Sequence, residues 1–94
     1  MIRHIVLWSL HEPERAQEFA TMLRRCARLV DGQRGYWVAT RAPGLQATCD
    51  VGLVADFEDL AALQVYLDHP LHREVSAALA PLRRDRHVLD VPTQ

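Results

Sequence analysis

The stretch that begins at Tyr66 contains the residue types best suited to moving protons. Tyr66 is followed by His69 and His72, with Pro70 between the two histidines. Histidine titrates near neutral pH, so a buried imidazole beside a tyrosine hydroxyl can act in general acid–base chemistry. Proline also fits the first position of a helix, and Asp68 or His69 can cap the free amides there. We interpret His69 and Pro70 as a helix start, whereas His72 is either a pocket residue or a surface histidine.

The spacing of apolar residues predicts the elements that must position this segment. Runs of β-branched and aromatic residues indicate strands, and apolar residues that recur every three or four positions indicate helices with one buried face. Pro13 and Pro70 open helices, and Gly32 ends one. In chain order we expect a strand at 2–10, a helix opened by 12–14 and ended by 31–32, a strand at 35–40, a loop at 41–46, a strand at 49–57, helices from 58 and from 70, a strand at 86–91 and a frayed end at 92–94.

This order, βαββααβ, is typical of a ferredoxin-like protomer of the α+β class. We expect residues 1–94 to form a single domain, a four-stranded antiparallel sheet with its helices on one face. The other face would carry Ile5, Leu7 and Val54, and a monomer rarely exposes such residues contiguously. We therefore predict a homodimer in which the open faces of two sheets stack on each other.

The overall composition excludes several classes of protein. A net charge of −1 argues against nucleic acid or an anionic membrane as the main partner. All 11 basic residues are arginines, which excludes Schiff-base catalysis by a lysine. No apolar run has the length of a transmembrane helix, and the apolar run 5–10 is too short for a signal peptide. We expect a cytoplasmic protein.

Neither a metal nor a cofactor is expected. His69 and His72 are three residues apart, but His69 precedes Pro70 and belongs to the cap, so the two rings need not converge. Cys26 and Cys49 have no metal-site spacing, and we interpret both as reduced core residues. The chain has no phosphate-binding glycine loop and no dinucleotide fingerprint.

Residues 1–8, 50–57, 67–72 and 85–90 form a recognisable set. The opening Arg-His-Ile-Val-Leu, together with the downstream His-Pro-Leu-His, is a fairly specific combination. The set resembles the stress-responsive α/β-barrel family, called Dabb, over nearly the whole chain and most weakly at 41–48. The resemblance implies a ferredoxin-like protomer whose sheet pairs with that of a second copy to form a dimeric α/β barrel. This agrees with the prediction from the apolar open face.

The resemblance also implies an activity. The best-understood protein of this kind, olivetolic acid cyclase, is a plant polyketide cyclase that closes a ring by an aldol reaction without a cofactor. Its catalytic tyrosine and histidine match Tyr66 and His72, and a pocket histidine on its first strand matches His4. A further histidine of its third strand falls at Val51. The resemblance thus implies His72 as the general base and Tyr66 as the hydrogen-bond donor.

Three functions remain open from the sequence. The chain is a binder of a small hydrophobic or polyketide-like molecule, a cofactor-free cyclase, or an interaction module whose ligand is its partner chain. Convergence of His4, Tyr66 and His72 on one apolar cavity would favour chemistry. Asp90 would orient a histidine there or cap the strand end. The other residues expected to line the pocket are apolar: Val6, Trp8, Phe19, Leu23, Val51, Leu53 and Leu63.

Overall fold

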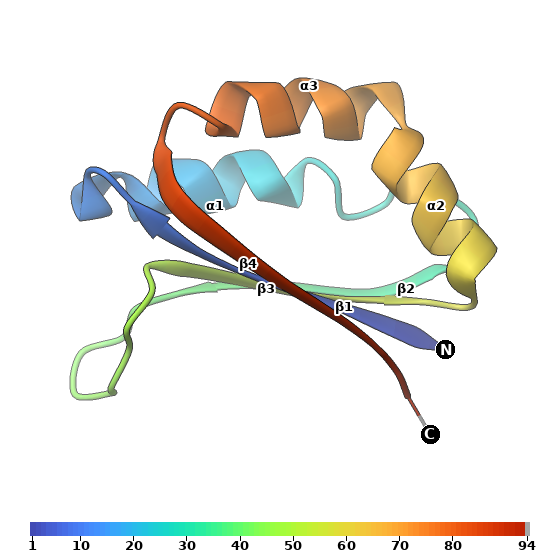
Figure 1. Cartoon of the computed structure of the whole chain (residues 1–94), viewed down its shortest axis with the longest axis horizontal. Coiled ribbons are helices and arrows are strands. Elements are labelled where there is room, and N and C mark those ends of the chain that lie inside the picture. The colour runs from blue at the N-terminus through green and yellow to red at the C-terminus, as the bar shows by residue number, and fades with distance from the viewer. Residues whose placement is uncertain (94) are drawn as a thin grey trace.

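The helices lie on one face of a four-stranded antiparallel sheet, as Figure 1 shows for the computed structural model. The structure describes residues 1–93. It confirms the predicted ferredoxin-like α+β fold and its βαββααβ order. The elements are β1 (Ile2–Leu10), the 3₁₀ turn η1 (Pro13–Arg15), α1 (Ala16–Arg24), β2 (Gln33–Thr40), β3 (Val51–Phe57), α2 (Leu60–Asp68), α3 (Pro70–Leu79) and β4 (Arg83–Pro92).

The sheet has the strand order β2-β3-β1-β4, which makes β2 and β4 its edges. Successive side chains of a strand point to opposite faces, so one face of β1 carries His4, Val6 and Trp8. All three are buried beneath the helices, as the sequence predicted. Trp8 meets Phe19 of α1 edge-on, with ring centroids 5.2 Å apart. The core therefore lies between this face and the helices.

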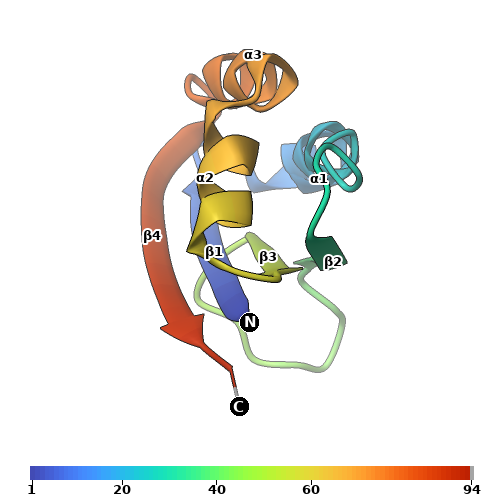
Figure 2. The ribbon, with the colours of Figure 1, turned by 90° about the vertical axis from the view of Figure 1, so that its right-hand side faces the viewer.

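The opposite face of the sheet carries an apolar row that crosses all four strands. The register pairs Trp37 of β2 with Val54 of β3, Val54 with Ile5 of β1, and Ile5 with Leu89 of β4. Trp37 is 63% exposed and Leu89 is 60% exposed. No helix covers this face in Figures 1 and 2, where the loop between β2 and β3 descends on the same side. The predicted placement of Ile5, Leu7 and Val54 away from the helices is thus confirmed.

The first helix is shorter than the sequence predicted, because α1 ends at Arg24 and not near residue 30. From there the backbone amides bond three residues back, as in a 3₁₀ turn. Side chains from β2 satisfy the last carbonyls: the Tyr36 hydroxyl donates to the Leu23 carbonyl, and the Gln33 amide donates to the Cys26 carbonyl. Cys26 stays buried as a free thiol. Tertiary contacts therefore replace the last helical turns.

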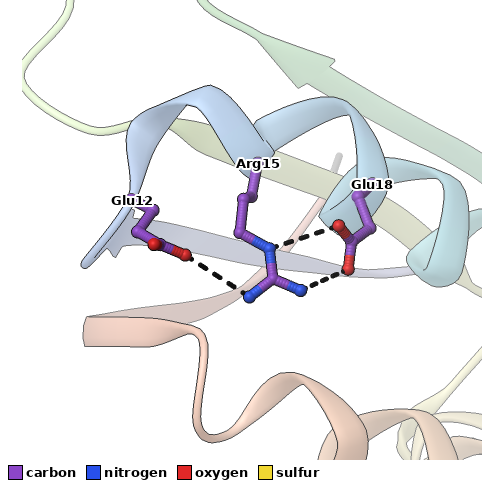
Figure 3. Close-up of polar contacts among 3 residues, drawn as sticks. All are labelled: Glu12, Arg15 and Glu18. Atoms are coloured by element: carbon purple, nitrogen blue, oxygen red, sulfur yellow. Dashed lines mark hydrogen bonds and ion pairs between the residues drawn. The ribbon is translucent and has the colours of Figure 1, made fainter.

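The start of this helical segment is a 3₁₀ turn followed by α1. Arg15 connects the residue before this turn to α1, because its guanidinium contacts Glu12 at 3.5 Å and Glu18 at 2.6 Å (Figure 3). These side chains are exposed, so water screens the ion pairs and their contribution to stability is small.

The last strand is longer than predicted, since β4 spans Arg83–Pro92 and not 86–91. Its end is not frayed as far as the structure describes it: the Thr93 amide donates to the Met1 carbonyl at 2.9 Å. Gln94 lies outside the described residues. Among the described helices, none is long and apolar enough to cross a membrane.

Candidate functional site

A cavity of about 40 Å³ lies between the sheet and the helices. A water molecule needs roughly 10–15 Å³ of such space, so the cavity holds a few waters, and a larger ligand must widen it. Every element except η1 and β2 contributes to its wall, together with Cys26, which follows α1. The lining residues are His4, Val6, Trp8, Leu23, Cys26, Leu53, Tyr66, His72, Val75, Ser76, Leu79, Arg83 and Arg86.

His4 is held in one orientation by Asp90. The two residues face each other across the pairing of β1 with β4, and Nδ1 of His4 lies 2.5 Å from Oδ1 of Asp90. The His4 side chain is only 3% exposed, whereas Asp90 is partly open to water. A carboxylate accepts hydrogen bonds, so Nδ1 of His4 carries a proton, and Nε2 is an acceptor whenever the ring is neutral. Asp90 thus orients a histidine, the first of the two roles predicted for it.

Tyr66 lies at the centre of an aromatic cluster. It is part of α2, whose start is capped by Asp59 accepting from the Ala62 amide. Its ring centroid is 4.6 Å from that of His72 and 4.9 Å from that of Phe57. Tyr66 is fully buried, and burial raises the pKa of its hydroxyl to about 12. The hydroxyl therefore keeps its proton at neutral pH.

The hydroxyl of Tyr66 bonds to Tyr36, a residue that the sequence analysis did not select. The two oxygens are 3.1 Å apart, and Tyr36 also bonds the Leu23 carbonyl at 2.9 Å. Because a carbonyl can only accept, Tyr36 donates its single proton to Leu23, and Tyr66 donates to Tyr36. Burial also raises the pKa of Tyr36. The signal in the sequence was strand parity, since Tyr36 shares the helix-facing side of β2 with buried Val38.

The predicted helix start at His69 and Pro70 is confirmed. His69 is the N-cap of α3, and its Nδ1 accepts from the Leu71 amide at 3.0 Å. Pro70 follows as the first helical residue. The ring of His69 therefore serves the cap and does not line the cavity, whereas His72, one turn later, does. In Figure 2 this junction joins α2 to α3 above the sheet.

The surroundings of His72 lower the pKa of its ring. Burial of the ring disfavours the imidazolium most, and a hydrogen bond to the backbone of Leu67 partly opposes this. Repulsion from His4 when its ring is protonated, and from the guanidinium of Arg86, lowers the pKa further. His72 is therefore a neutral imidazole at neutral pH, the form that a general base requires.

The cavity includes most of the residues expected there. His4, Tyr66 and His72 line one space, and so do the apolar Val6, Trp8, Leu23 and Leu53. Phe19, Val51 and Leu63 are buried in the core but do not line the cavity, and Asp90, also expected at the site, is absent from the lining and contacts His4 instead. Arg83 and Arg86 also line the cavity, and the sequence analysis selected neither; Arg83 lay outside the strand predicted at 86–91. Within residues 1–93, no group of three or more metal-binding side chains converges.

Comparison with known proteins agrees with this architecture. The family model described as Stress Responsive A/B Barrel Domain matches residues 2–93. A structure from Thermobifida fusca, described as a dimeric ferredoxin-like protein of unknown function, is 25% identical with a TM-score of 0.86, covering 98% of this chain and 90% of that chain. A Dabb family protein from Mesorhizobium loti is 23% identical with a TM-score of 0.77, covering 99% and 97%.

A third similar structure is described as an antibiotic biosynthesis monooxygenase. It is 16% identical with a TM-score of 0.79, covering 100% of this chain and 99% of that chain. At this identity the likeness concerns the fold alone. None of the curated proteins compared with this chain matches it significantly.

Proposed function

Because this chain belongs to the stress-responsive α/β-barrel (Dabb) family, we propose that it is a homodimeric barrel protein that binds a small, mostly apolar molecule between sheet and helices. The convergence of His4, Tyr66 and His72 on one cavity that also has apolar walls carries this proposal. Small-molecule sites combine apolar walls with a few placed polar groups, and this cavity has both. Its small volume favours a ligand of few atoms or one that parts β4 from α3.

The open face of the sheet supports the dimer. The row Trp37, Val54, Ile5 and Leu89 would be buried if two copies stacked sheet on sheet. The similar Thermobifida fusca protein is described as dimeric. Burial of the two exposed side chains at the ends of this row would stabilise the assembly through the hydrophobic effect.

The dimer is tested by adding a charge to this face. Trp37→Glu should shift the protein from dimer to monomer in analytical ultracentrifugation, because a carboxylate in a stacked interface loses its hydration. Leu60→Glu is the matched control, since Leu60 of α2 is 64% exposed but lies on the helical side. A monomeric wild-type protein, or equal dissociation of both variants, would contradict a sheet-to-sheet dimer.

Binding is tested with acetoacetamide, a small neutral β-ketoamide. We expect saturable changes in the ring carbon-bound proton resonances of His4 and His72 in a ¹H–¹³C NMR titration. His87 is the internal control, because its side chain is exposed on β4 and does not line the cavity. Absence of a response at both cavity histidines, or an equal response at His87, would contradict binding of a small carbonyl compound there.

The second candidate function is cofactor-free acid–base catalysis, an aldol-type ring closure of a polyketide-like substrate. The observation that favours it is a neutral His72 beside a protonated Tyr66. His72 would take a proton from the carbon between two carbonyls, and the Tyr66 hydroxyl would turn from Tyr36 to stabilise the enolate oxygen. The enolate carbon then attacks a second carbonyl, and the His72 imidazolium returns the proton to the new alkoxide.

Catalysis is tested by hydrogen–deuterium exchange at the methylene group of acetoacetamide in D₂O. This reports the proton abstraction without requiring the natural substrate. The wild-type protein should exceed the buffer rate, and His72→Gln and Tyr66→Phe should each lower the enhancement by about 10²-fold or more. With His87→Gln, the methylene group should exchange at the same rate as with the wild-type protein. If the exchange rate with the wild-type protein equals the rate in buffer alone, catalysis is contradicted and only the binding function remains.

A further inference from the structure

Two arginines line the cavity beside its apolar and acid–base residues. Arg83 and Arg86 belong to β4, which forms one side of the cavity opposite α3. Figure 2 shows β4 curving upward from the sheet edge toward α3. Ser76 of α3 is the other polar lining residue apart from the acid–base groups. The margin of the cavity is therefore positively charged. A purely apolar ligand would not require these charges.

An irregularity in β4 places both arginines on the cavity side. Trp8 pairs with Arg86 and Ser9 with Asp85, but Leu10 pairs with Arg83, so β4 contains one extra residue. Residues three apart in a regular strand point to opposite faces, and a bulge restores them to the same face. Arg83 and Arg86 consequently lie opposite the helix-facing residues Leu10 and Trp8.

Neither arginine is neutralised by an ion pair. Among the described residues, no carboxylate lies within 4.0 Å of the guanidinium of Arg83 or Arg86. The acidic residue nearest along this side of the strand is Asp90, whose Oδ1 bonds to His4. Burial and the charge of Arg83 lower the pKa of Arg86, and Asp90 opposes this. Two neighbouring cations at the cavity margin, Arg83 half-buried and Arg86 exposed, have no bound carboxylate and therefore favour an incoming anion.

We propose that Arg83 and Arg86 bind the carboxylate of the ligand, so that this cavity selects small keto acids over neutral carbonyl compounds. This rests on the proposed binding function and adds a substrate class to it. The guanidinium is planar and presents paired N–H donors that match a carboxylate. The Ser76 hydroxyl on the facing helix adds a further donor. With the carboxylate held at this margin, the carbonyl end of the ligand extends toward His72 and Tyr66.

The test compares acetoacetate with acetoacetamide, which differ by an oxygen anion in place of an NH₂ group. Dissociation constants come from the NMR titration of the His4 and His72 ring resonances. The wild-type protein should bind acetoacetate at least about 10-fold more tightly than the amide, as expected for a charge-assisted contact. Arg83→Gln and Arg86→Gln should each reduce this preference, and the double variant should abolish it while still binding the amide.

Arg84→Gln is the matched control. It removes the same charge from the neighbouring position, but Arg84 contacts Asp85 and does not line the cavity. It should keep the wild-type preference. Equal affinity of the two ligands in the wild-type protein, or an equal loss in Arg84→Gln, would overturn the carboxylate site while the binding function stands. Absence of binding by both ligands would overturn both.

Acetonylphosphonate separates a carboxylate from a phosphate-like anion. We expect it to bind no more tightly than acetoacetate in the wild-type protein. Tight binding of the phosphonate, with acetoacetate no better than the amide, would overturn the proposed ligand class. Retained circular dichroism spectra and unfolding midpoints in each variant establish that the losses come from the site.

Discussion

The Nδ1 atom of His4 lies 2.5 Å from the Oδ1 atom of Asp90, although the two residues are 86 positions apart in the chain. The register of β1 and β4 sets them directly opposite each other. The contact fixes the tautomer of a buried imidazole that lines the cavity. The fourth residue of the chain and the fifth residue from its end thus meet beside the same cavity.

Loss of this carboxylate should destabilise the protein and release the ring. Asp90→Ala leaves Nδ1 of a buried histidine without its partner, which costs about 1–3 kcal/mol of unfolding free energy. We also expect the ¹⁵N chemical shifts of the His4 ring to report a mixture of the two tautomers in place of one. Urea unfolding and NMR measure the two effects. Asp68→Ala removes an exposed carboxylate near Arg73 and should cost less than about 0.5 kcal/mol.

The hydroxyls of Tyr36 and Tyr66 should be energetically coupled. Tyr36→Phe removes the contact with Tyr66 and also the donor to the Leu23 carbonyl, so it should cost more than Tyr66→Phe. A double-mutant cycle should give a coupling of about 0.5–1.5 kcal/mol, the range of one hydrogen bond. Strictly additive losses in urea unfolding would mean that the two hydroxyls do not stabilise each other.

His72 should make stability fall as the solution is acidified. Its folded pKa lies below the unfolded value of about 6.5, so the unfolded chain binds the proton first. The stabilisation is complete above about pH 6.5 and is lost as pH falls toward the lowered folded pKa. Urea unfolding of His72→Gln from neutral pH to pH 5 should show a shallower slope than the wild type. His11→Gln, which changes an exposed histidine just after β1 that does not line the cavity, should keep the wild-type slope.

The buried carboxylate of Asp50 should anchor the start of β3. It accepts the Leu10 amide at 2.8 Å and Nε of Arg41 at 3.1 Å, and so joins the end of β1 to both ends of the loop between β2 and β3. Asp50→Ala should cost about 1–3 kcal/mol, because it leaves a buried amide unpaired. Arg41→Gln should cost less, since its side chain is half exposed. Equal effects of the two changes would place the stabilisation in the ion pair instead of the amide contact.

Local patterns in the sequence were sufficient for the order of elements and for part of the site. Alternation along β1 placed His4, Val6 and Trp8 on one face, and the proline after His69 placed the start of α3. Helical spacing then placed His72 on the side of Val75 and Leu79, which line the same cavity. These features depend on neighbours within a few residues, so periodicity and capping rules reveal them.

Contacts between distant segments decided the remainder. The apolar stripe after Arg24 looked helical, but side chains of β2 supplied the hydrogen-bonding partners that end α1 early. The register between β1 and β4 decided that Asp90 faces His4, and one extra residue in β4 turned Arg83 toward the cavity. The sequence by itself thus determined the elements, their buried faces and the presence of acid–base residues. Only the tertiary structure determined the partners of those residues, because hydrogen-bonding partners and strand register depend on residues far apart in the chain.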